Sequence, residues 1–291
     1  MASVPAILRP RRRRLFAGHP AESAARHAML VLACVVSVYP LVWMVFQSLK
    51  SPTDFYTNIW GPPAHPLWSN FTGAWSSGDL GRYMLNSVIV TGSTVVVVCA
   101  LGYLLAYGIV LMQVRGAKLI VGVFAVSLFL PVQLLLIPLY VLESHAGLLN
   151  NYWSLILPYA AGGLPFAVIF LVAYLRSVPR EIEEAAIVDG CRSLQVLWKV
   201  MVPLSRPAFA TVVIFQFLSS WNEFLLAMTL VQSDSRRTLP MGILNFFQTY
   251  NNTNYAYIFA ALTMSAVPII AVFVVFQRQF IGGLTAGAVK M

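Results

Sequence analysis

The distribution of charge along this 291-residue chain limits most strongly what it can fold into. Six apolar stretches have no Lys or Arg in their interiors, and each is close to the ~20 residues that a helix needs to cross a bilayer. They are Ala28–Leu49, Ser87–Leu111, Leu119–Leu142, Tyr152–Leu175, Ala208–Val231 and Tyr257–Gln277. Only 10% of the residues are charged, against about 25% in soluble domains. The sequence therefore predicts an all-α polytopic membrane protein with six transmembrane helices.

Basic residues predict how these helices are oriented. If the N-terminus lies inside, 15 of the 19 Lys and Arg residues fall in cytoplasmic segments, as the positive-inside rule requires. The four on the outer side are Lys50, Arg82, Arg236 and Arg237. We interpret the first apolar stretch as a signal anchor, because it exceeds the usual length of a signal-peptide core and no small-residue cleavage site follows it. The chain is therefore expected in the inner membrane, with both termini in the cytoplasm. This orientation accounts for the +9 net charge, which need not indicate nucleic-acid binding.

The same pattern divides the chain into three parts. Residues 1–27 form a basic N-terminal arm, residues 28–281 the six-span domain, and residues 282–291 a cytoplasmic tail. The three cysteines and four histidines are scattered, so we predict neither a metal site nor catalytic residues. These residues are Cys34, Cys99, Cys191, His19, His27, His65 and His145.

A polar insert, residues 176–206, separates the fourth and fifth stretches. Acidic residues after Pro179 are typical of a helix N-terminus. Apolar or small residues then recur every three or four positions, which indicates one face of a helix or a helix pair. They are Ile182, Ala186, Gly190, Leu194, Leu197 and Met201. An interfacial helix on the inner leaflet is one interpretation, but it would favour Lys and Arg over this acidic cluster, so we prefer a protein partner.

The order of residues within this insert resembles a known family. Glu184-Ala185-Ala186 is followed after three residues by Gly190 and after nine more by Val200-x-Val202-Pro203. This pattern is similar to the loop by which permeases of ATP-binding-cassette (ABC) importers contact their ATPases, with Val in place of the usual Ile and Leu. Further segments resemble the carbohydrate-type permeases, such as the smaller maltose permease subunit. They are Asn86-Ser87, Pro179–Glu181, Trp221–Ala227, Thr238–Pro240, Phe259–Ala261 and Gln277–Lys290.

The resemblance covers the chain from the first span onward and implies a type I ABC importer transmembrane fold with a cytoplasmic coupling helix between helices 4 and 5. It implies ATPase contacts at Glu184, Ala185, Ala186, Asp189, Gly190 and Pro203, and in the tail at Gly282, Gly283, Thr285 and Lys290. The implied partners are a second permease subunit in a heterodimer, two ABC ATPase subunits, an external solute-binding protein and the lipid bilayer. No cofactor is expected on this chain. ATP and Mg would bind the partner ATPase, because the sequence has no phosphate-binding loop of the Gly-x-x-x-x-Gly-Lys-[Ser/Thr] type.

Glu223 is a carboxylate within the fifth predicted span, beside Trp221 and Asn222. A charge inside a membrane is costly and marks a candidate functional site. These three residues are candidates for the solute path, where Glu223 would accept hydrogen bonds from sugar hydroxyls. The alternative is a structural Glu223 that binds a neighbouring helix.

Prolines within the third, fourth and sixth spans are also typical of helices that line a path, although prolines are common in membrane helices generally. They are Pro131, Pro138, Pro158, Pro165 and Pro268. The spacing Gly102-x-x-x-Ala106 indicates a close helix contact.

Two other classes of protein remain open. An ion-coupled carrier would contain more intramembrane charge and internal repeats. A membrane-embedded transferase would contain clustered Asp, Glu or His at a membrane face, and the acidic cluster 181–184 better fits a helix N-terminus. The sequence therefore favours a non-enzymatic permease that imports a sugar or related polar solute by alternating access.

Overall fold

The computed structural model describes residues 20–250 and 254–288, and the regular structure in these two ranges is helical. Its helices are α1 (Pro20–Ser48), α2 (Pro52–Thr57), α3 (Ser69–Ser77), α4 (Leu80–Val110), α5 (Ala117–Ser127), α6 (Leu136–His145), α7 (Trp153–Ser177), α8 (Arg180–Val188), α9 (Ser193–Gln195), α10 (Val202–Leu204), α11 (Arg206–Trp221), α12 (Leu225–Leu230), α13 (Leu239–Tyr250) and α14 (Tyr255–Ala288). Two 3₁₀ turns, Val132–Leu135 and Asp234–Arg236, and a π-helix, Val196–Met201, complete the secondary structure of these ranges. Residues 1–19 of the predicted basic arm lie outside the described residues, and residues 20–27 belong to α1.

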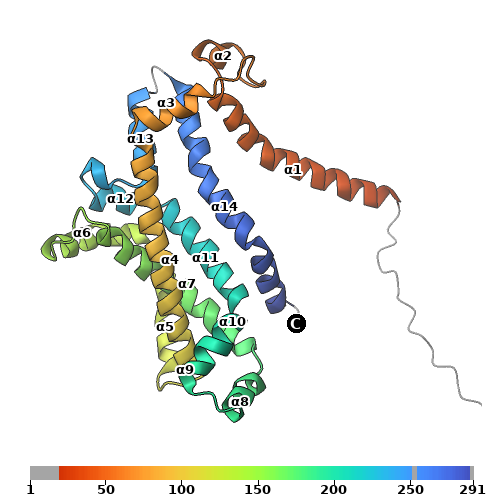
Figure 1. Cartoon of the computed structure of the whole chain (residues 1–291), viewed down its shortest axis with the longest axis vertical. Coiled ribbons are helices and arrows are strands. Elements are labelled where there is room, and N and C mark those ends of the chain that lie inside the picture. The colour runs from red at the N-terminus through yellow and green to blue at the C-terminus, as the bar shows by residue number, and fades with distance from the viewer. Residues whose placement is uncertain (1–19, 251–253, 289–291) are drawn as a thin grey trace, which may run out of the picture.

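Helices α4, α7, α11 and α14 form the bundle (Figure 1). α4 packs along α7, while α11 packs against both α4 and α14. The approach of α4 to α7 depends on Gly102, because a Cβ at this position would lie only 3.2 Å from the Cβ of Ala167. Ala106, one turn further along α4, is fully buried. The close helix contact that Gly102 and Ala106 predict is therefore present between α4 and α7.

The connections between helices gather at the two ends of the bundle. The α4–α5 connection and the α8–α10 segment belong to one apolar cluster, at what we call the loop end. α3, α13 and the start of α14 belong to another cluster, at the opposite end. The α6–α7 connection also reaches the opposite end, because Asn150 accepts a 2.9 Å hydrogen bond from the backbone N–H of Ser233. The two loops predicted to be cytoplasmic thus share one end of the bundle, and the three predicted to be external share the other.

Two of the six predicted spans are not continuous helices. Four helices, α1, α4, α7 and α14, are long and apolar enough to cross a membrane alone, and the number rises to six only if each of two bent pairs counts as one span. In the third span, α5 and the α6 segment differ in direction by 92°, and the break contains Pro131, which has no N–H to continue a helix. The second bent pair is formed by Ser193–Leu204 and Arg206–Trp221, which differ in direction by 71°. The fifth predicted span is also interrupted, because α11 ends at Trp221 and α12 begins at Leu225.

Helix α1 leaves the bundle and projects from its opposite end (Figure 1). Its apolar stretch is exposed, and the helix packs mainly against α14. The chain just after α1 is held by Lys50, a residue that sequence analysis considers only as an outer charge. Lys50 is fully buried and donates from Nζ to the carbonyl oxygens of Asn58 and Ile59. Burial lowers the pKa of the Lys50 ammonium, an effect that the Asp54 carboxylate partly opposes.

At the opposite end, α13 contacts α4 through a glycine, which provides a test of the packing. A Cβ at Gly242 would lie 2.1 Å from the Tyr83 ring, and the ring cannot withdraw because its hydroxyl donates to Asp234 at 2.8 Å. We expect Gly242→Ala to lower the free energy of unfolding by about 1–3 kcal/mol, as overpacking does. Thermal unfolding of the purified protein measures this, with Gly92→Ala as the matched control because a Cβ at Gly92 meets nothing within 4 Å. Equal melting temperatures for the two variants would contradict the packing described.

Candidate functional site

The polar insert begins with α8, which ends in a turn that requires glycine. The N–H of Gly190 donates to the Ile187 carbonyl at 3.0 Å, and the N–H of Cys191 donates to the Ala186 carbonyl at 3.0 Å. These are the two hydrogen bonds of a Schellman C-cap, in which the residue at the turn is left-handed. Gly190 accordingly has φ +85°, and a Cβ there would meet nothing within 4 Å. Gly190 therefore provides a bend, and a side chain there would make no close packing contact with residues 20–250 or 254–288.

The predicted coupling residues occupy two different environments. Glu184, Ala185 and Asp189 are exposed on α8 and its C-cap, next to the exposed Gly190. Ala186 points inward and is only 8% exposed. Pro203, also exposed, lies apart from them in α10. Thus four of the six residues share one exposed surface.

Large apolar side chains are exposed around this surface. They are Ile187, Val188, Leu194 and Trp198, with Val188 86% exposed and Leu194 71% exposed. We call these four residues the apolar tip. Several large exposed apolar side chains within one short loop are typical of an interaction site.

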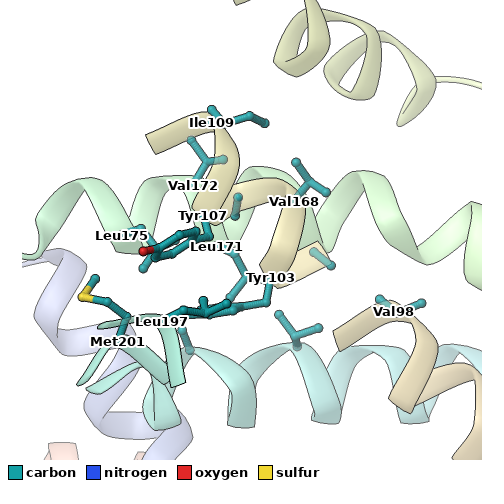
Figure 2. Close-up of a cluster of buried hydrophobic side chains, with 14 of the residues drawn as sticks. Val98, Tyr103, Tyr107, Ile109, Val168, Leu171, Val172, Leu175, Leu197 and Met201 are labelled. Carbon is teal, nitrogen blue, oxygen red and sulfur yellow. The ribbon is translucent and has the colours of Figure 1, made fainter. Parts of the chain in front are cut away.

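The inward side of the insert packs on the bundle (Figure 2). Ala186, Leu197 and Met201 belong to the same buried cluster as Leu171 of α7 and Tyr103 of α4. The single face predicted from the three- and four-residue spacing is therefore divided. The turn at Gly190 changes the helical phase between α8 and the residues that follow it, and beyond the turn Leu194 is exposed while Leu197 is buried.

The segment from α9 to α10 returns the chain to the bundle through an irregular helix. Residues Val196–Met201 form a π-helix, a wide turn that is common at functional sites, and Pro203 follows it. In an α-helix the Pro203 ring would clash with the carbonyl of residue 199, so a widened turn before this proline relieves the clash. The helix axis then turns by 71° before α11. Pro203 is therefore part of a bend.

A cavity of about 560 Å³ lies where helices are broken or contain proline. Its walls come from α5, α6, α7, α11 and α12 and are mostly apolar. Its polar groups come from Ser127, Tyr159, Ser219, Ser220 and Glu223, and Pro138, Pro158 and Pro165 also line it. Interrupted helices around a cavity are a recurring way to build solute sites in membrane transporters.

Glu223 lies in the break between α11 and α12. Its Oε1 accepts from the N–H of Leu226 at 2.8 Å, and its Oε2 accepts from the N–H of Ala227 at 3.2 Å and from the Tyr159 hydroxyl at 2.6 Å. The carboxylate thereby satisfies two free N–H groups at the start of α12 and joins this helix to α7. These contacts are those expected of a structural Glu223, and the same residue also lines the cavity, as expected of a path residue.

The two neighbours of Glu223 do not line the cavity. Trp221 is 2% exposed, stacks on Phe217 and donates from Nε1 to the Ser265 carbonyl of α14 at 3.3 Å. Asn222 is exposed and donates to the Leu218 carbonyl of its own helix. Of the three candidate path residues, only Glu223 faces this cavity.

Sequence reasoning missed the residues that hold α12 in place. Tyr159 is one of them, and Asn150 is another, with φ +61°. The Asn150 N–H donates to the Leu230 carbonyl, and its Oδ1 accepts from the N–H groups of Gln232 and Ser233. A tyrosine and an asparagine more than 60 residues from their partners carry no local signal, so only the folded structure reveals them.

The predicted tail contacts lie at the end of α14. This helix continues to Ala288 without a break at residue 282, so Gly282, Gly283 and Thr285 have helical backbone. Lys290 lies outside the described residues.

A helical bundle with a cavity among interrupted helices and an exposed apolar loop defines the membrane-spanning subunit of a solute transporter. The chain matches, over residues 98–284, the family described as "Binding-protein-dependent transport system inner membrane component". It belongs to this family.

Relatives of known name agree with this assignment. The chain is 36% identical over 270 residues to the diacetylchitobiose uptake system permease protein NgcG of Streptomyces coelicolor, covering 92% of this chain and 89% of that protein. It is 34% identical over 278 residues to the sulfoquinovosyl glycerol transport system permease protein SmoH of Agrobacterium fabrum, covering 94% and 95%. A bacterial ABC transporter that imports alginate has a chain of the same fold, with a TM-score of 0.75, 23% identity, and coverage of 89% of this chain and 96% of that one.

Proposed function

We propose that this chain forms half of the translocation pathway of an ATP-driven importer for a sugar or a related polar solute. The observation that carries the proposal is the apolar tip beside the Gly190 turn, on a loop whose residues match the ATPase-contacting pattern. The sugar class is supported by relatives named for the transport of diacetylchitobiose and sulfoquinovosyl glycerol.

The ATPase would bind the exposed surface of α8 and its C-cap. Glu184, Ala185, Asp189 and Gly190 would contact it, with the apolar tip buried against the partner. Ala186 would act indirectly by seating α8 on the bundle, and Pro203 by forming the bend before α11. This chain itself would not hydrolyse ATP or bind a cofactor. The tail residues Gly282, Gly283, Thr285 and Lys290 remain predicted ATPase contacts.

The loop end would face the cytoplasm and the opposite end the exterior. The supporting observation is the charge bias, since Arg115, Lys118 and the five basic residues between 176 and 206 belong to connections at the loop end. The exterior end would receive the solute-binding protein. The exposed apolar length of α1 would contact lipid and the second permease subunit.

The solute would pass through the cavity at Glu223. Most of its wall is apolar, which suits transient contact with sugar rings, and hydroxyl groups of Tyr159, Ser219 and Ser220 offer hydrogen bonds. The Glu223 carboxylate already accepts three hydrogen bonds, so it would bind solute with its remaining lone pairs while holding α12.

Transport in sealed vesicles tests the proposal. We expect the complex purified through a tagged form of this chain to hydrolyse ATP and to accumulate a sugar from a radiolabelled panel that includes diacetylchitobiose and trehalose. Accumulation should require ATP on the loop-end side and persist when valinomycin and nigericin collapse ion gradients. An ion-coupled carrier gives the reverse result, and failure to accumulate any sugar of the panel would contradict the substrate class.

A further inference from the structure

The chain between the loop and the bundle turns by 71°, between the helices Ser193–Leu204 and Arg206–Trp221. Ser205 lies at the vertex and is fully buried. Pro207 has no N–H, so the hydrogen bond that would continue a straight helix to the Pro203 carbonyl cannot form. Backbone hydrogen bonds remain on either side of this gap, from the Ser205 N–H to the Met201 carbonyl and from the Phe209 N–H to the Ser205 carbonyl, and the position of the vertex depends on further partners.

Tyrosines from two long helices supply these partners. Tyr103 of α4 is hydrogen-bonded through its hydroxyl to the Ser205 hydroxyl, with the two oxygens 3.0 Å apart. Tyr174 of α7 donates its hydroxyl to the carbonyl of Leu204 at 2.9 Å. The vertex residue and the residue before it are thus tied to the bundle by side chains from two different helices.

A third tyrosine lies one turn further along α4. The Tyr107 hydroxyl donates to the carbonyl of Ser193, at the start of α9, at 3.4 Å. Figure 2 shows Tyr103 and Tyr107 on α4 in the same cluster as Leu197 and Met201 of the loop. The Tyr103 ring also packs on Phe209 of α11, with ring centroids 4.7 Å apart.

Apolar packing and hydrogen bonding have different effects at the junction between the loop and the bundle. Packing of Leu197 and Met201 keeps the loop on the bundle but is not directional, so it permits sliding. A hydrogen bond fixes distance and angle between two atoms. The three hydroxyls therefore determine where the vertex lies along α4 and α7.

We propose, on the basis of the function proposed above, that Tyr103 and Tyr174 are positioning residues that transmit movement of the ATPase-bound loop to α4 and α7. A partner that displaces α8 would move the vertex, and the two hydroxyls would carry that movement into α7, which borders the cavity, and into α4, which packs along α7. Without them the loop would move with the ATPase while the cavity lags behind.

Accessibility of the cavity tests this without knowledge of the solute. The reporter is Ser219→Cys, placed in a chain in which Cys34, Cys99 and Cys191 are replaced by Ala, and a membrane-impermeant maleimide is added outside vesicles that contain the complex. ATP with vanadate should increase labelling of this cysteine in the parent. In Tyr103→Phe/Tyr174→Phe the increase should fall by about three- to tenfold, the range expected for one or two hydrogen bonds, while ATP hydrolysis continues.

Matched variants distinguish loss of movement transmitted from the loop from loss of stability of the complex. Tyr140→Phe removes a hydroxyl from α6 that makes no hydrogen bond with the described residues, and it should behave as the parent does. Ser205→Ala removes the Tyr103 bond from the loop side, so combining it with Tyr103→Phe should add nothing to either change alone. Ser205→Thr should restore the response because it retains the hydroxyl. If the double tyrosine variant fails to assemble, Ser205→Ala alone decides the matter.

The outcomes are distinct. An unchanged ATP-dependent increase in the tyrosine variants or in Ser205→Ala would overturn the inference. A loss of labelling in proportion to the loss of assembled complex and of ATP hydrolysis would also overturn it, since a purely structural bond acts in that way. No ATP-dependent increase in the parent would overturn the proposed function as well.

Discussion

Gly190→Trp is expected to abolish binding of the ATPase and with it ATP-driven uptake. The left-handed backbone at Gly190 costs a residue with a side chain about 1–3 kcal/mol. The space around a Cβ here is open within the chain, so the indole would project from the exposed surface of the loop. There it would hold the ATPase away from the apolar tip, and we expect affinity to fall at least ~100-fold, equivalent to roughly 3 kcal/mol. Co-purification of ATPase activity with the tagged chain measures this effect.

Two variants isolate the cause. Gly190→Ala has the same backbone strain without the bulk, and we expect it to retain the ATPase. Gly116 also has φ +85° and open space, and it lies at the loop end but outside α8–α10, so Gly116→Trp controls for an exposed indole at a strained position. ATPase retained by Gly190→Trp, or lost equally in Gly116→Trp, would show that the turn at Gly190 does not form the docking surface.

The existence of this loop and its glycine turn follow from local sequence. A charged segment between apolar stretches, acidic residues at its start and a glycine at its break are signals that depend on neighbours along the chain. Which of the loop's apolar residues are buried and which are exposed does not follow from local sequence. Ala186 is buried and Val188 exposed because the bundle covers one side of α8, and no spacing rule records which residues a distant helix will cover.

The third and fifth predicted spans are interrupted helices, a feature that the sequence did not predict for a related reason. Length and hydropathy identify apolar stretches, but they do not distinguish a straight helix from two short ones. Pro158 and Pro165 lie within an uninterrupted α7, whereas the chain bends by 92° at the break that contains Pro131. Whether a proline kinks or ends a helix depends on which tertiary contacts satisfy the freed backbone groups.

The cavity also shows, for a single side chain, that sequence does not reveal tertiary contacts. An intramembrane carboxylate is visible in the sequence and correctly identifies Glu223 as unusual. Its three donors come from two residues on α12 and from Tyr159 on α7, which is 64 residues away. Trp221, two positions earlier, is the last residue of α11 and donates to α14, whereas Glu223 lies in the non-helical break that follows. Adjacency in sequence therefore did not imply a shared site.

Glu223→Gln is expected to slow solute uptake by about tenfold or more while the complex still assembles, because hydrogen bonds to a charged group contribute about 1.5–3 kcal/mol. The carboxylate accepts from donors on both oxygens. A glutamine amide has one acceptor oxygen, so in either orientation its NH₂ group faces a donor, either the Leu226 N–H or the pair formed by Ala227 N–H and Tyr159 hydroxyl. The start of α12 would lose part of its cap and move within the cavity wall. Initial rates of ATP-driven uptake in vesicles, normalised to assembled complex, measure the change.

Two further variants test whether the effect of Glu223→Gln arises at the cavity. Tyr159→Phe removes one donor and leaves the carboxylate with two backbone N–H groups, so its effect on uptake should be smaller than that of Glu223→Gln. Trp221→Phe removes the bond to Ser265 outside the cavity, and it should lower thermal stability without changing the normalised rate. If Glu223→Gln instead removed folded or assembled protein, Glu223 would be a cap for α12 alone. If Trp221→Phe slowed normalised uptake as much as Glu223→Gln, the solute path would run on the α14 side of α11 and the cavity at Glu223 would not be the path.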